Sequence, residues 1–174
     1  CFFMKKALLV IDVQEDYLGE NRNKKRLHFQ NPALLIQNIN TAIEKYKIDG
    51  YEIIYIAEIL PDLFTNRLVF GFSIKGTEGA KLVKGLNILS DNYFEKQLPN
   101  SFSNKQLCKL IKEKNIEEVV LCGIDEAGCV KETAKGGIKL GLNVKIIKDA
   151  VDTVFDNRRN KIRENLNKLG VKYI

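Results

Sequence analysis

The chain has 174 residues, of which 45% are hydrophobic and 29% are charged, so it is long enough to form one domain around a buried core. Its apolar runs are far shorter than the ~18 residues of a membrane span, and its apolar start is too short for a signal peptide. The net charge of +6 is scattered, which favours a lysine-rich solvated surface over a nucleic-acid partner. We therefore predict a single domain over residues 1–174, with residues 1–6 at its periphery.

The cysteine and histidine content limits the chemistry. The chain has four cysteines, and their spacing matches neither a zinc site nor a disulfide framework (Cys1, Cys108, Cys122 and Cys129). His28 is the only histidine, so a histidine-based metal site is excluded. We predict a reduced, cytoplasmic protein that uses neither a metal nor another cofactor. Cys108 and Cys122 are expected to be small hydrophobic core residues.

The first half of the chain predicts two strands and one helix. Residues 7–11 form a continuous apolar run, which is typical of a strand buried on both faces, and the chain turns polar at Asp12. Asn31 and Pro32 have the residue types preferred at a helix N-cap and at the first helical position. An apolar helical face follows until Gly50, and residues 51–59 predict the second strand.

Residues 60–90 are less regular. They form either a lid over a pocket or a loop whose phenylalanines fill a satellite core. A short strand over residues 92–95 then leads into Lys96. Ser103 and Gln106 fit a capping box for a helix that ends near residue 115.

The rest of the chain continues the alternation. We expect strands over residues 117–122, 144–147 and 171–174, and helices over 129–140, stopped by Gly141, and 157–169. Strict alternation of strands and helices predicts an α/β protein. Its fold would be a three-layer Rossmann-like one, with a central, mostly parallel sheet flanked by helices.

Three reactive side chains follow strands in this arrangement. Asp12 ends the first strand, Lys96 ends the short strand, and Cys129 comes after the strand over residues 117–122. Taken singly, Asp12 fits a turn cap, Lys96 a surface charge and Cys129 a core residue. Ligands of open parallel sheets bind outside the carboxyl ends of the strands, so the three together predict an active site.

The turn before Cys129 supports a reactive thiol. Gly123 and Gly128 bracket this turn, and glycine adopts backbone angles denied to other residues. Cys129 would then lie at a helix N-terminus, where free N–H groups and the helix dipole favour a thiolate. The same N–H groups can form an oxyanion hole.

These motifs resemble the isochorismatase-like cysteine hydrolase family. The resemblance spans residues 7 to about 153 and rests on motifs that occur in the family's order and spacing (Asp12-Val-Gln14, Lys96 followed by Phe102, Gly123-x5-Cys129-Val130-x2-Thr133-Ala134 and Asp149-Ala150). It implies a homodimer or homotetramer that hydrolyses a C–N bond of a small molecule. Isochorismatases proper lack the cysteine, so its presence favours the amide-cleaving branch.

The resemblance also implies roles for individual residues. Cys129 would be the nucleophile, Asp12 the proton shuttle, and Lys96 the cation that favours the thiolate and orients the acid. A cis peptide would fall at Ile124-Asp125, and the N–H groups of Asp125 and Cys129 would form the oxyanion hole. Gly128 and Gln14 are further predicted substrate-binding positions.

The chain departs from the family pattern at three places. Asp125 and Glu126 would oppose thiolate formation if they faced Cys129, although Glu126 can instead point to solvent and favour the helix N-terminus. The Asp-x-His pair that binds metal in the nicotinamidase branch is missing, which argues against a nicotinamidase. Gly136 and Gly137 interrupt a helix, which indicates close packing either within the chain or between subunits.

We therefore predict a cysteine-dependent hydrolase that cleaves an amide or related C–N bond through a thioester. The alternative is a non-catalytic binding or regulatory protein on the same fold. A nucleic-acid-binding protein is supported only by the net charge.

Overall fold

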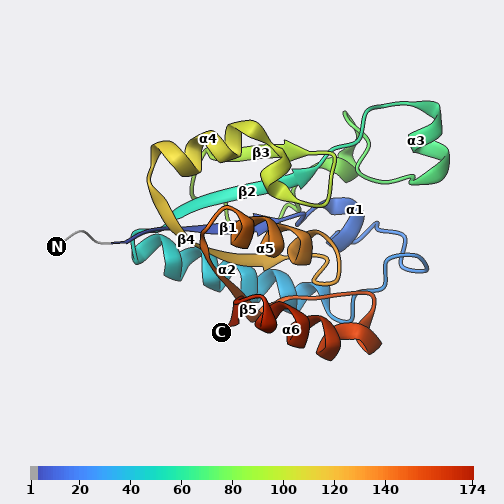
Figure 1. Ribbon diagram of the computed structural model, residues 1–174. Helices are drawn as coiled ribbons and strands as arrows, with labels where there is room; N and C mark the ends of the chain where they lie inside the picture. Colours follow the sequence, from blue (N-terminus) through green and yellow to red (C-terminus); the bar gives the residue numbers. More distant parts are fainter. Residues whose placement is uncertain (1–3) are drawn as a thin grey trace.

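A computed structural model describes residues 4–174 and shows a six-stranded sheet between two layers of helices (Figure 1). Every neighbouring pair of strands is parallel, in the order β3-β2-β1-β4-β5-β6. The strands are β1 (Lys5–Ile11), β2 (Glu52–Glu58), β3 (Tyr93–Lys96), β4 (Ile116–Gly123), β5 (Asn143–Val151) and β6 (Lys172–Tyr173). The predicted α/β class with a parallel central sheet is confirmed.

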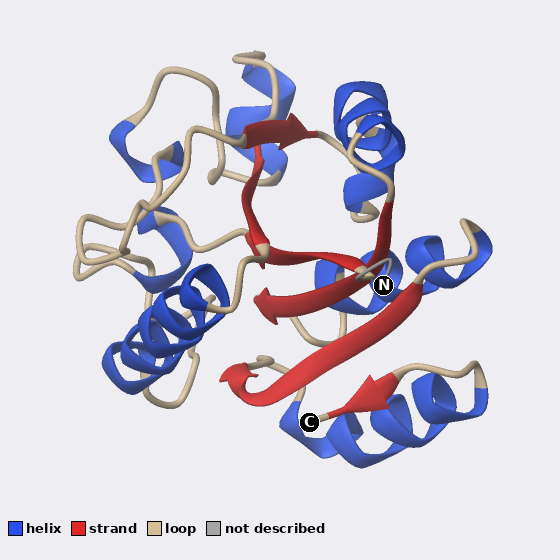
Figure 2. Cartoon of the chain, turned by 90° about the vertical axis from the view of Figure 1, so that its left-hand side faces the viewer, coloured by secondary structure: helices blue, strands red, loops and turns tan. Residues whose placement is uncertain are grey.

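Helices cover both faces of this sheet (Figure 2). The α-helices are α1 (Glu15–Leu18), α2 (Pro32–Ile48), α3 (Phe64–Val69), α4 (Lys105–Glu113), α5 (Cys129–Lys139) and α6 (Arg159–Lys168). Short 3-10 turns are η1 (Glu78–Ala80), η2 (Ser101–Ser103) and η3 (Asp156–Arg158). Core side chains of α2 pack on one face of the sheet, and those of α4, α5 and α6 pack on the other.

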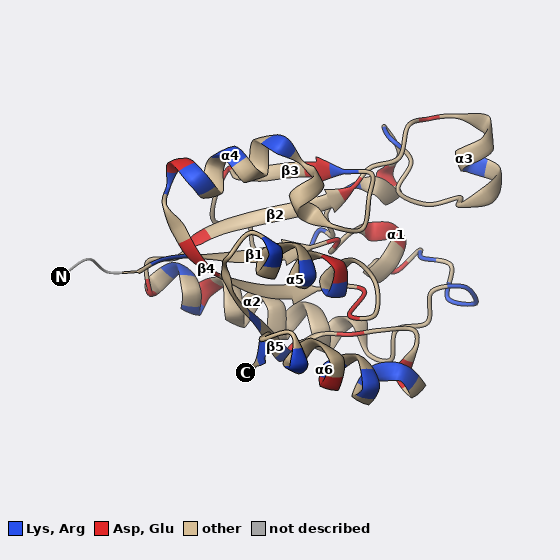
Figure 3. Ribbon diagram, viewed as in Figure 1, with Lys and Arg blue, Asp and Glu red and all other residues tan. Residues whose placement is uncertain are grey.

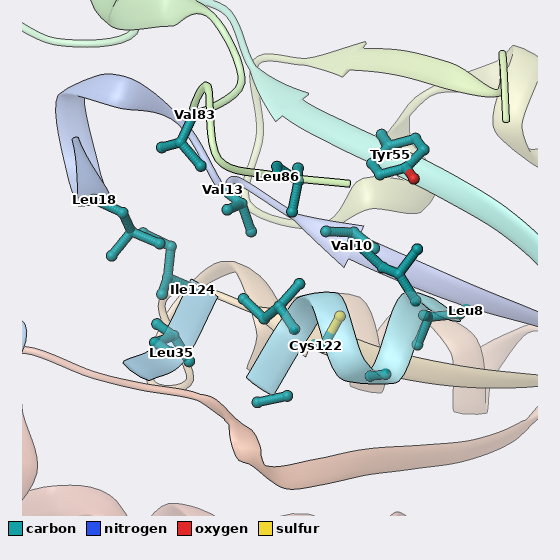
Figure 4. Close-up of a cluster of buried hydrophobic side chains, with 14 of the residues drawn as sticks. Leu8, Val10, Val13, Leu18, Leu35, Tyr55, Val83, Leu86, Cys122 and Ile124 are labelled. Carbon is teal, nitrogen blue, oxygen red and sulfur yellow. The ribbon is translucent and has the colours of Figure 1, made fainter. Parts of the chain in front are cut away.

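The strand β1 shows why its sequence is continuously apolar. Leu8 and Val10 belong to the core that α2 covers, together with Cys122 of β4 (Figure 4). Leu9 and Ile11 belong to the core on the opposite face. Both faces of the central strand are therefore shielded from water, as expected for a parallel sheet.

Two predicted helix starts have different outcomes. The side chain of Asn31 accepts a hydrogen bond from the Leu34 N–H, which confirms the predicted N-cap of α2. The predicted capping box at Ser103 is wrong, because Asn104 caps α4 instead by accepting bonds from the N–H groups of Gln106 and Leu107. Ser103 lies in the preceding 3-10 turn, so the helix begins after it.

The phenylalanines of residues 60–90 lie in different environments, and a role of this segment as a lid stays a prediction. Phe72 packs against the core, whereas Phe64 is 79% exposed on α3, which projects from the body of the molecule (Figure 1). Lysine and arginine residues are distributed over several helices and loops (Figure 3). The helices of residues 4–174 include none that is long and apolar enough to cross a membrane. The part of the predicted periphery at residues 1–3 lies outside the described residues, and β1 already begins at Lys5.

Candidate active site

Asp12, Lys96 and Cys129 meet at the carboxyl edge of the sheet. The Lys96 Nζ lies 2.9 Å from Asp12 Oδ2 and 3.2 Å from Cys129 Sγ. Asp12 and Lys96 are buried, and Cys129 is half-buried. The structure therefore brings together the three residues that were predicted to form a site because each follows a separate strand.

Strand order explains how these residues reach one another. Asp12 follows β1, and its N–H donates to the carbonyl of Ile56 in β2, which extends the sheet by one residue. Lys96 ends β3, which is separated from β1 by β2. A long side chain is therefore needed to cross β2, and lysine places its ammonium group beside Asp12 while its stem stays buried.

The turn after β4 brings the chain close to β1. Gly123 has a φ of +111°, and a Cβ at this position would lie 2.0 Å from the carbonyl oxygen of Ile11. Only glycine tolerates both conditions. The peptide bond between Ile124 and Asp125 is cis, at the position that the family resemblance implied. Together these features direct the chain towards the start of α5.

The backbone beside the thiol offers two unused donors. The N–H groups of Asp125 and Cys129 donate to no other residue within 4–174. The Asp125 side chain turns back, since it accepts bonds from the N–H groups of Ala127 and Val154. Gly128 donates its N–H to the Asp125 carbonyl and ends the turn one residue before α5. Two free N–H groups next to a nucleophile are the donors that an oxyanion needs.

Glu126 does not point to solvent, so that expectation was wrong. Its carboxylate is fully buried and accepts hydrogen bonds from Arg163 at 2.6 Å and from Arg159 at 3.0 Å. Both arginines lie on α6, which the turn contacts through this ion pair. The charge of Glu126 is therefore neutralised by the two arginines of α6.

Burial dominates the electrostatics of the site. Desolvation raises the pKa of the Cys129 thiol, the charge of Asp12 raises it further, and Lys96 opposes both. Desolvation likewise raises the pKa of Asp12 against the attraction of Lys96. The thiol is therefore harder to ionise than its position at a helix start predicts. Removing the thiolate from water costs more free energy than Lys96 and the helix N-terminus offset. These directions favour a neutral thiol beside Asp12 and Lys96, whose charged groups lie 2.9 Å apart.

Gln14 is held by hydrogen bonds to backbone groups. Its Nε2 donates to the carbonyls of Glu58 and Ala80, and its Oε1 accepts from the Glu58 N–H. The side chain is fully buried. It therefore joins the end of β1 to β2 and to η1, and its contact with substrate stays a prediction.

Three residues near the site were not singled out from the sequence. Glu58 ends β2 and accepts a hydrogen bond of 2.5 Å from the Tyr17 hydroxyl. Ser73 donates to that hydroxyl at 2.8 Å. One signal was present for Glu58, because it ends an apolar strand abruptly, as Asp12 does.

The donor set does not fit the metal of the nicotinamidase branch. Residues 4–174 include no group of three or more His, Cys, Asp or Glu side chains placed to hold a metal ion. His28, the sole histidine, is exposed in the loop before α2.

The fold and this site define an α/β protein with a cysteine, an aspartate and a lysine at the carboxyl edge of its sheet. The isochorismatase domain model matches residues 6–174, and the chain therefore belongs to the isochorismatase family.

Known proteins similar to this chain include two curated relatives and a solved structure. An uncharacterized isochorismatase family protein of Bacillus subtilis, YddQ, is 26% identical over 91% of this chain and 84% of its own. A probable inactive nicotinamidase of Arabidopsis thaliana is 24% identical over 95% of this chain and 90% of the relative. The crystal structure of N-carbamoylsarcosine amidase from Thermoplasma acidophilum has a TM-score of 0.81, with 22% identity over 98% of this chain and 95% of that one. This last likeness shows the shared fold.

Proposed function

We propose that this isochorismatase-family protein is a cysteine hydrolase that cleaves an amide or related C–N bond of a small molecule. One observation carries the proposal. A single ammonium group, that of Lys96, lies within hydrogen-bonding distance of both the Asp12 carboxylate and the Cys129 sulfur. Nucleophile, proton acceptor and cation are the groups that amide cleavage needs.

The first half of the reaction follows from the neutral resting thiol. As Cys129 Sγ attacks the substrate carbonyl carbon, Asp12 takes the thiol proton, so no free thiolate has to accumulate. The carbonyl π electrons move to oxygen, which the N–H groups of Asp125 and Cys129 would stabilise. Lys96 keeps Asp12 oriented and offsets the growing negative charge.

In the second half, the C–N bond breaks and Asp12 returns the proton to the leaving nitrogen, which departs as ammonia or an amine. The carbonyl carbon stays on Cys129 as a thioester. Asp12 then takes a proton from water, whose oxygen attacks the thioester carbon. Collapse of this intermediate releases the acid, and the proton on Asp12 restores the thiol.

The likeness in fold to an N-carbamoylsarcosine amidase supports the amide class. The experiment is a screen of small primary amides for ammonia release, followed by mass spectrometry of the acyl-enzyme. We expect Cys129→Ala to abolish both signals, while Cys108→Ala, on the outer helix α4, keeps them. Full turnover by Cys129→Ala would refute the mechanism. The dimer or tetramer expected from the family resemblance is checked by light scattering.

A second candidate is a non-catalytic binding protein on the same fold. Two observations favour it: one relative is described as a probable inactive nicotinamidase, and burial raises the pKa of the Cys129 thiol. Alkylation rates by iodoacetamide at neutral pH discriminate between the two. If Asp12 serves as a base, Cys129 reacts faster than Cys108 despite its burial, whereas a rate at or below that of Cys108 favours the binding protein.

A further inference from the structure

A second carboxylate stands beside the reacting groups. Glu58 is the register partner of Lys96 on the neighbouring parallel strand, so both side chains leave the sheet on the same face. Burial and the charges of the other site residues have the largest effects on the pKa values of Asp12, Cys129 and Lys96. The charge of Glu58 comes next and raises all three pKa values. Its charge therefore reaches all three members of the site.

Glu58 is held in place on one side only. Its Oε2 accepts the hydrogen bond from Tyr17, whose hydroxyl is fixed in turn by the buried Ser73. Burial, followed by the charge of Glu58, raises the pKa of Tyr17, so this phenol stays a donor. The Glu58 Oε1 accepts no hydrogen bond within residues 4–174, and no lysine or arginine of this part of the chain pairs with the carboxylate. The side chain is half-buried and therefore still reachable.

Asp12 supplies an independent sign of a missing donor. Its Oδ1 is buried and has no hydrogen-bond partner in the described chain, whereas Oδ2 receives Lys96. An unmet acceptor of this kind is costly unless a ligand satisfies it. The site thus has two carboxylates but one cation, and each carboxylate keeps one oxygen open.

We propose that Glu58 forms a subsite for a cationic group, an ammonium or guanidinium, carried by the amide substrate. This inference rests on the proposed function, since it names the class of amide that the site accepts. The cation would bind Glu58 Oε1 and restore charge balance, while the amide carbonyl lies at Cys129. Tyr17 and Ser73 act as positioning residues, because they hold the carboxylate at the strand end.

The first test needs no substrate. Cys129 is modified with two methanethiosulfonates of similar size, one ending in ethylammonium and the other in ethylsulfonate, and the rates are followed by mass spectrometry of its peptide. The ratio of the two rates measures the electrostatic potential near the sulfur. A change in the pKa of the thiol alters both rates equally, so it does not affect the ratio. We expect the cationic reagent to react faster, and Glu58→Gln to lower the ratio about 10-fold at low salt.

Glu52→Gln is the matched control, since Glu52 lies at the opposite end of the same strand. It should leave the ratio unchanged. Tyr17→Phe, which releases Glu58 without removing its charge, should lower the ratio less than Glu58→Gln does. An unchanged ratio in folded Glu58→Gln overturns the subsite, and so does an equal fall in Glu52→Gln.

The second test uses turnover of glycinamide, which carries an ammonium group, and of its neutral isostere glycolamide. We expect the protein to prefer glycinamide, and Glu58→Gln to lower kcat/KM for it about 10- to 100-fold with a much smaller effect on glycolamide. A preference for the neutral amide contradicts the subsite even if the hydrolase function holds. If no amide of any charge is hydrolysed, the proposed function fails, and the reagent ratio still decides the subsite.

Discussion

Replacement of Lys96 by methionine should destabilise the protein strongly, and more at alkaline than at acid pH. Methionine keeps an unbranched stem of similar length but removes the charge that lies 2.9 Å from Asp12. At this separation the attraction is about 6 kcal/mol for an effective dielectric constant of about 20. Because the partner that remains is a buried carboxylate, we expect a loss of about 3–5 kcal/mol in the free energy of unfolding near pH 8.

The pH dependence follows from the direction of the Asp12 pKa shift. Burial already raises this pKa above its ordinary value of 3.8, and without Lys96 it rises further. A carboxyl with a raised pKa in the folded state binds its proton more tightly there, so its stability contribution is complete at low pH and is lost as pH rises through the folded pKa. The deficit of the variant should therefore grow from pH 5 to pH 8, by at most about 1.4 kcal/mol per unit.

Urea unfolding at both pH values measures this deficit. Lys114→Met is the matched control, because Lys114 also lies 2.9 Å from a carboxylate, that of Glu52, but both side chains are substantially exposed. That change should cost at most about 1 kcal/mol at either pH. If Lys96→Met is within 1 kcal/mol of the parent protein at pH 8, or if its deficit does not depend on pH, the reasoning fails.

Three further predictions concern the turn, the helix α5 and the reaction. Glu126→Gln should lower the free energy of unfolding by about 3 kcal/mol in urea titrations, because it removes the buried negative charge and replaces one of the two accepting oxygens by an NH2 donor facing an arginine; a loss below 1 kcal/mol would contradict this. Gly137→Ala should cost about 1–3 kcal/mol, since its Cβ would lie 2.7 Å from Val144, whereas Gly85→Ala, with 3.9 Å to its nearest neighbour, should be near neutral. The acid limb of the kcat/KM profile should lie above pH 3.8, because Asp12 must be unprotonated and its pKa is raised; a limb at or below that value argues against Asp12 as the base.

Local patterns were sufficient to predict the order of the elements and the cap of α2. The continuous apolar run of β1 and the Asn31 N-cap depend on residues that are close in the chain, so they can be recognised from sequence alone. The same holds for reactive residues that follow strands, because the carboxyl ends of parallel strands share one edge. Asp12, Lys96 and Cys129 could therefore be nominated together.

Features that depend on distant partners could not be predicted in this way. The two arginines that neutralise Glu126 lie 33 and 37 residues further along the chain. The sequence left open whether Gly137 allows close packing within the chain or between subunits. In the structure the close neighbour is Val144 of the same chain, which lies against the helix. Gln14 belongs to a family-like motif, yet its partners are backbone groups of β2 and of the loop near η1.

The thiol shows the same division most clearly. From sequence, Cys129 was placed at a helix start after a glycine-bracketed turn, and that position favours the thiolate. Whether this preference prevails depends on how much water the folded chain removes from the sulfur and on which charges surround it. Packing decides both, and here burial together with Asp12 and Glu58 outweighs Lys96 and raises the pKa of the thiol. The residues of the site can thus be predicted from the sequence. The shifts of their pKa values depend on the tertiary structure, because distant parts of the chain together exclude water from them.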